Sequence, residues 1–195
     1  MGSRGTAALP MSFNVIHIFM KWKNDREVYE SIGRFCVDFE QVCRSMEACI
    51  RTILHGKGLT NTAIQEILLS SYTADPLRAL LHSLIGQTVV KGKTEEEKIC
   101  SKIFGQLQEL INHRNDLINS KWYVIGMEDG KEKEVLGLGV KLHANKKGVA
   151  TKNFKLKKAE LDEFIKQCRE VNIMISLLTR CVMGVRNIRE CFKVQ

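Results

Sequence analysis

An arginine on the apolar face of a predicted helix is the feature of this sequence that most strongly suggests chemistry. Steps of about 100° per residue place Arg114 near the middle of that face, which is formed by Ile99, Ile103, Leu107, Leu110, Ile111, Leu117 and Ile118. Arginine is rarely buried without a partner, so Arg114 needs a carboxylate, water or a bound ligand. Asn115 and Asn119 lie on the adjacent edge, and their amides are suited to orienting a phosphate or a ribose.

A purely structural role for Arg114 is the alternative. Glu40 and Glu47 stand seven residues apart on one flank of an earlier predicted helix, and either carboxylate is a candidate partner for a buried ion pair. His113 lies on the opposite edge of the apolar face from Asn115, where a lone histidine is usually an ordinary packing residue. The sequence leaves both roles of Arg114 open.

The segment from His113 to Trp122, HRNDLINSKW, resembles the motif of HEPN-type helical domains. That motif has an arginine, a polar residue and a histidine after four to six intervening residues, often as R-N-x-φ-x-H followed by tryptophan. The predicted helix order is also similar over about residues 24–184. The resemblance implies a metal-independent ribonuclease of toxin or defence systems, in which the ribose 2′-hydroxyl attacks its own phosphate. It further implies a homodimer whose two motifs form one groove.

The sequence departs from this family at the catalytic position, because Asn119 stands where the family has histidine. An amide cannot exchange protons near neutral pH, and loss of general acid–base catalysis costs about 10²- to 10⁴-fold in rate. We therefore expect an endoribonuclease site of Arg114, Asn115 and Asn119 that is weak or silent, without metal or cofactor. Asn119 is a natural loss of catalysis, a deliberate His to Asn change, or a sign that the resemblance is coincidental.

The elements that must position these residues are mainly helical. Apolar residues at helical spacing predict helices over about 24–55, 62–71, 75–87, 94–119 and 158–184. Asp75 and Pro76 are predicted as N-cap and first residue of the third helix. Thr94 and Glu97 form a predicted capping box, and the glycines around Lys57 end the first helix. The expected fold is a bundle of four or five helices.

A basic β-hairpin is expected between the last two helices, over about residues 121–157. Residues 122–126 and 135–140 alternate around an Asp129-Gly130 turn, and a further strand is expected near 149–156. Residues 141–158 contain seven lysines and no acid, a composition suited to RNA or simply to a solvated loop. The predicted RNA-binding residues are Lys141, Lys146, Lys147, Lys152, Lys155 and Lys157, with Trp122 or Tyr123 stacking on a base. A tryptophan after a helix end is, however, more often a packing anchor.

Length and composition indicate one ordinary folded domain. The chain has 195 residues, 44% of them hydrophobic and 27% charged, with a net charge of +8. Residues 1–12 look like a cloning scar before Met11, and the apolar run 13–20 is too short to cross a membrane. We expect a tail over 1–23, the bundle over 24–184 and a C-terminal tail over 185–195.

Seven cysteines without a C-x-x-C pair indicate reduced core thiols in a cytoplasmic protein, and no zinc site.

Two functions follow as alternatives. The leading one is an HEPN-like protein that binds RNA more readily than it cuts it. The second is a non-catalytic helical interaction module, such as a regulatory subunit or antitoxin-like partner. In that case Arg114 is a structural or interface residue and the apolar run 13–20 is a docking tail.

Overall fold

The computed structural model describes residues 22–89, 94–126, 135–145, 148–185 and 187–192. The predicted cloning scar over residues 1–12 and the apolar run 13–20 lie outside these residues. The described chain is mainly helical, as predicted, and no helix in it is long and apolar enough to span a bilayer. The helices are α1 (Trp22–Gly56), α2 (Thr62–Leu69), α3 (Ala74–Thr88), α4 (Thr94–Ile118), α5 (Lys158–Val182) and α6 (Ile188–Cys191). The strands are β1 (Lys121–Gly126), β2 (Val135–Asn145) and β3 (Gly148–Lys157).

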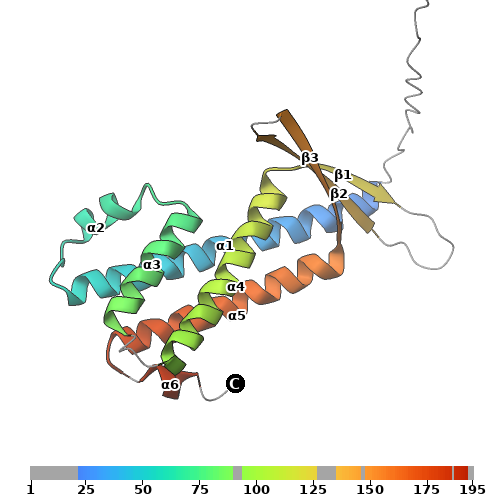
Figure 1. Cartoon of the computed structure of the whole chain (residues 1–195). Helices are drawn as coiled ribbons and strands as arrows, with labels where there is room; N and C mark the ends of the chain where they lie inside the picture. Colours follow the sequence, from blue (N-terminus) through green and yellow to red (C-terminus); the bar gives the residue numbers. More distant parts are fainter. Residues whose placement is uncertain (1–21, 90–93, 127–134, 146–147, 186, 193–195) are drawn as a thin grey trace, which may run out of the picture.

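The core lies between α1, α5, α4 and α3, with α1 and α5 running side by side (Figure 1). An aromatic cluster joins three of these helices. The Phe35 ring on α1 lies 6.1 Å from Phe39 and 5.9 Å from Phe164 on α5, and His113 on α4 stacks on Phe164 at 4.1 Å. Phe35 is fully buried, and burying a phenylalanine side chain contributes about 1.5–3 kcal/mol. His113 therefore has a packing role, as the sequence suggested.

Polar contacts along the α1–α5 interface add directional constraints to this packing. Arg169 Nε on α5 donates to Asp38 Oδ2 on α1 at 3.0 Å. Further along the same pair of helices, Ser45 Oγ donates to Asn172 Oδ1. A sliding of one helix along the other would break both contacts, so they help to fix the relative register of α1 and α5.

Two glycines with positive φ follow the ends of α1 and α5. Gly58 has φ +94° and Gly184 has φ +73°. After Gly58 the Leu59 N–H donates to the Leu54 carbonyl, and after Gly184 the Val185 N–H donates to the Arg180 carbonyl. These bonds define Schellman motifs, which pair carbonyls that the helix itself leaves unsatisfied. The predicted glycine end of the first helix is confirmed at Gly58, and the last helix ends close to the predicted Gly184.

The start of α3 differs from the prediction by two residues. Thr73 is the N-cap and Ala74 the first helical residue, so Asp75 and Pro76 lie inside the first turn. Asp75 Oδ1 instead pairs with Arg78 Nη2 at 3.1 Å. Proline is tolerated here because N–H groups of the first turn have no helical acceptor.

The predicted C-terminal tail contains the short helix α6. Asn187 caps it by accepting from the Arg189 N–H at 3.1 Å. Ile188 and Cys191 are buried against the bundle, and Arg189 Nε lies 3.6 Å from Glu96 Oε1 on α4. The bundle thus extends to the last described residues.

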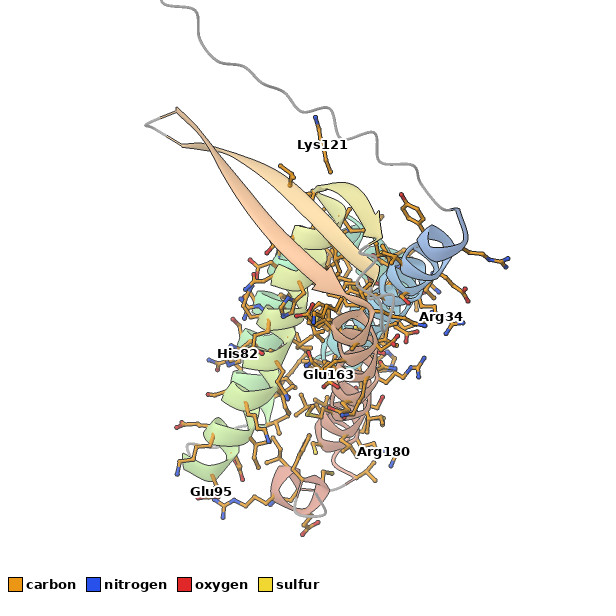
Figure 2. The ribbon with its side chains drawn as sticks, turned by 90° about the vertical axis from the view of Figure 1, so that its right-hand side faces the viewer. Arg34, His82, Glu95, Lys121, Glu163 and Arg180 are labelled. Atoms are coloured by element: carbon orange, nitrogen blue, oxygen red, sulfur yellow. The ribbon has the colours of Figure 1, made fainter. Side chains whose placement is uncertain are left out.

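The segment between α4 and α5 forms a three-stranded antiparallel sheet in the order β1-β2-β3, at one end of the bundle (Figure 1). Lys121 lies opposite Val140, and Asn145 lies opposite Gly148. The Asp129-Gly130 turn lies outside the described residues. Figure 2 shows Lys121 beside the sheet, with Glu95 of α4 and Arg180 of α5 at the other end of the bundle.

The last strand runs into α5 without a connecting loop. β3 ends at Lys157 and α5 begins at Lys158. The Lys157 N–H donates to Glu160 Oε2 at 2.7 Å, which satisfies a donor at the helix start.

Candidate functional site

Arg114 lines a pocket of about 270 Å³ between α1, the start of α3 and α4. Its wall contains Asn115 and both candidate carboxylate partners of Arg114, but not His113 or Asn119. The lining residues are Phe39, Glu40, Cys43, Glu47, Tyr72, Thr73, Ala74, Asp75, Leu77, Ile111, Arg114 and Asn115. The structure therefore brings Glu40, Glu47, Arg114 and Asn115 to one place.

Helical spacing explains how the pocket forms. On α4, Ile111 is buried at 1% exposure, whereas Arg114 and Asn115, three and four residues later, are only partly buried. On α1, buried Phe39 and Cys43 share the pocket with the more exposed Glu40 and Glu47. The site lies where the apolar faces of α1 and α4 end.

The ion pair between Arg114 and Glu40 or Glu47, which the sequence offered as the alternative, is absent from the described residues. No described carboxylate lies within 4.0 Å of the Arg114 guanidinium, and Nη1 donates only to Asn115 Oδ1, at 3.4 Å. Glu47 Oε2 instead lies 3.7 Å from Arg51 Nη2, one turn further along α1. Arg51 in turn pairs with Glu66 on α2 at 2.7 Å. Glu47 therefore pairs with Arg51, four residues along the same helix, rather than with Arg114.

The thiol of Cys43 reports the electrostatics of the pocket. Burial raises the pKa of Cys43 to about 12, with a further increase from Glu40 and an opposing decrease from Arg114. The thiol is therefore protonated at neutral pH, and thiolates rather than thiols are nucleophiles. Cys43 is therefore not expected to serve as a catalytic nucleophile in this pocket.

The first turn of α3 adds a second source of positive potential. The pocket is lined by Thr73, Ala74 and Asp75, where the N–H groups of a helix start have no helical acceptor and the dipole is positive. The Thr73 side chain makes no cap hydrogen bond. The pocket thus combines an arginine and a helix N-terminus with the carboxylates of Glu40, Glu47 and Asp75. This combination suits a ligand that carries both an anionic group and hydroxyl or amine donors.

Asn119 does not join this pocket. It follows the last residue of α4, its side chain is exposed, and its N–H donates to the Asn115 carbonyl at 3.2 Å. Five helical steps separate its direction from that of Arg114 by about 140°. Within one chain, the three predicted catalytic residues therefore do not converge.

The predicted RNA-binding residues are placed mainly by their backbone. Trp122 and Tyr123 lie on β1 opposite Gly139 and Leu138. The β2–β3 register puts Lys141 directly opposite Lys152. Lys155 and Lys157 lie opposite Leu138 and Leu136 on β2, and Lys157 is exposed. Lys146 and Lys147 lie outside the described residues.

Two features of the surface were missed from the sequence. One is the contribution of residues 72–75 to the Arg114 pocket. The predicted helix start at these residues was the only sequence signal that could have indicated it. The other is a second pocket of about 730 Å³ between the ends of α1, α3 and α5 and the first turn of α2. Its polar lining includes Arg51, His55, Lys57 and Gln65, residues that share no sequence motif. Among the residues with described side chains, no cluster of His, Cys, Asp or Glu could hold a metal ion.

The chain matches no protein-family model, and the comparisons with curated proteins and with solved structures gave no significant match.

Proposed function

We propose that this chain is an HEPN-like RNA-binding protein whose Arg114 pocket holds the ribose phosphate of one nucleotide. The observation that carries the proposal is the state of Arg114. It is partly buried, it has no carboxylate partner among the described residues, and it lines a pocket with groups of both charges. A guanidinium in that setting gains most from an anionic ligand.

The two sides of the pocket match the two ends of a ribose phosphate. The Arg114 guanidinium and the first turn of α3 would hold the phosphate. The Glu40 carboxylate would accept a hydrogen bond from the 2′-hydroxyl, which is the group that distinguishes RNA from DNA. A pocket of about 270 Å³ is small for a ligand site, and it suits a single nucleotide unit of a longer strand.

The lysines of the sheet segment would supply the salt-dependent part of the affinity. Lys141 and Lys152 occupy directly opposed positions on β2 and β3. Like charges at such positions disfavour strand pairing, and an RNA backbone relieves that repulsion while releasing counterions. Neutralising Lys146, Lys147, Lys155 and Lys157 should therefore weaken RNA binding and reduce its dependence on salt.

Binding without efficient cleavage is expected, because Asn119 cannot act as an acid or a base. Arg114 and Asn119 point apart in one chain, so a composite site of the HEPN type would require a homodimer. Asn119→His in the full chain should then produce cleavage that leaves 2′,3′-cyclic phosphate ends in the presence of chelator. If this variant cuts no RNA, the nuclease part of the proposal fails while RNA binding is still measured separately.

Fluorescence anisotropy with a labelled single-stranded RNA and the DNA of the same sequence tests the proposal. Arg114→Ala should weaken RNA binding, and Glu40→Gln should reduce the preference for RNA over DNA. Arg180→Ala is the matched control, because it removes the same charge from an exposed site at the other end of the bundle (Figure 2). Equal affinity of wild type and Arg114→Ala for RNA would refute the proposed site.

One observation favours the alternative, an interaction module. On α2, Ile64, Ile67 and Leu68 are 44%, 72% and 50% exposed, so an apolar surface faces outward. Surfaces of this kind mark protein contacts, and a cognate regulatory or antitoxin-like protein would be the partner. Two results together would favour this function. RNA affinity would be unchanged in every variant, and a protein partner would co-purify with the wild-type chain but not with Ile67→Lys.

A further inference from the structure

Two free cysteines meet where the last two helices of the bundle come together. Cys181 lies in the last turn of α5, and Cys191 is the last residue of α6. Their Sγ atoms are 3.3 Å apart, and the two residues are 9% and 8% exposed. We propose that Cys181 and Cys191 form a reversible disulfide, which makes the α5–α6 junction a site of oxidative modification.

Forming the disulfide bond requires only a small movement of the chain. A disulfide requires sulfurs about 2.05 Å apart, so the two atoms must approach by roughly 1.3 Å. α6 has only four residues and sits near the end of the described chain. A small rotation of this short helix toward α5 brings the sulfurs together without displacing the long helices.

Other contacts keep the two thiols close. Ile188 is buried at 2% exposure, and Arg189 Nε lies 3.6 Å from Glu96 Oε1 on α4. These contacts hold α6 against the bundle (Figure 1). The second thiol is therefore present at high effective concentration once the first has reacted.

The reaction with a small disulfide such as glutathione disulfide is balanced. One cysteine thiolate attacks a glutathione sulfur and releases one glutathione thiol. The other cysteine then attacks the mixed disulfide and releases the second. The Sγ–Sγ bond replaces the glutathione S–S bond, and the two electrons and two protons lost by the cysteines appear in two reduced glutathiones.

The buried environment makes this reaction slow. Burial raises the pKa of Cys181 to about 12, with an additional increase from its contact with Cys191. Only a small fraction is thiolate at neutral pH, so formation over minutes to hours is expected rather than an immediate reaction. Once formed, the bond closes a short loop around the Gly184 turn and ties α6 to α5.

The test treats the native full chain with glutathione disulfide and then measures its intact mass after denaturation. A loss of about 2 Da is expected, with five of the seven thiols still free. Trypsin should yield residues 181–186 linked to residues 190–193, since Arg186 and Arg189 lie between the cysteines. The oxidised protein should also melt roughly 5–10 °C higher than the reduced one.

Two variants serve as controls. Cys100→Ser removes a neighbouring thiol that also acts on Cys181, and it should leave the cross-link intact. Cys191→Ser should abolish it. Seven unchanged thiols, stable glutathione adducts, or a link between other cysteines would each overturn the proposal, and peptide mapping of the wild-type protein decides this even if a variant folds poorly.

Discussion

Replacing Arg114 with alanine separates a functional arginine from a structural one. Breaking a buried ion pair by removing one partner costs about 3–5 kcal/mol. Arg114 has no described carboxylate within 4.0 Å, and its one hydrogen bond, to Asn115, is long at 3.4 Å. We therefore expect the free energy of unfolding to change by less than about 1 kcal/mol, a size typical of positions without such a pair.

The same substitution should act strongly on RNA binding. A hydrogen bond to a charged group contributes about 1.5–3 kcal/mol, which corresponds to a roughly 10- to 150-fold weaker Kd. Arg114→Lys keeps the charge but loses the planar guanidinium that holds a phosphate with two hydrogen bonds. Its affinity for RNA should therefore lie between those of the wild type and Arg114→Ala.

Urea denaturation followed by circular dichroism gives the stability, and anisotropy at fixed salt gives the affinity. If Arg114→Ala loses about 3 kcal/mol or more of stability and its RNA affinity is unchanged, this reasoning is refuted and Arg114 has a structural role.

Three further predictions concern the bundle itself. Phe35→Ala should reduce the free energy of unfolding by about 3–5 kcal/mol in urea titrations, because Phe35 is fully buried and a large cavity is left beside Phe164; a loss below 1 kcal/mol would contradict the packing described. Burial beside Phe104 lowers the pKa of His82, so stability should fall as the pH drops below about 6.5, where the unfolded state binds the proton more readily. His82→Gln should flatten that pH dependence of the urea midpoint, and an unchanged slope would exclude His82 as its source. Gly184→Ala should lower stability by about 1–2 kcal/mol, because the backbone at this position has a φ of +73°. The cost is purely conformational, since a Cβ added at Gly184 would have no atom within 4 Å. An unchanged melting temperature would contradict this prediction.

The helices could be predicted because their signal is local and repeated. Phe35, Phe39, Val42 and Met46 recur at helical spacing on α1, and all four are buried. By contrast, α6 has four residues, too few for a period to appear, and its burial depends on distant residues of α4 and α5. Its position follows from tertiary packing rather than from its own sequence.

The sequence predicted which residues lie near one another in the candidate site, but not which of them form ion pairs. The stripes on α1 and α4 suggested that Arg114 and Glu40 would face each other, and both line one pocket. Which groups pair depends on competition between side chains. Glu47 has Arg51 one turn away on the same helix, and a partner at i+4 is available whatever the tertiary arrangement. The start of α3 was misplaced for a related reason, since Thr73 and Asp75 are both good N-cap residues.

The junction between β3 and α5 has a mechanical consequence. Since Lys157 is both the end of a strand and the cap of a helix, no flexible spacer separates the sheet from the bundle on that side. A pull or twist applied to β3 would therefore act directly on the first turn of α5. Because α5 packs along α1, that force would pass to the central helices of the bundle rather than being absorbed at a hinge.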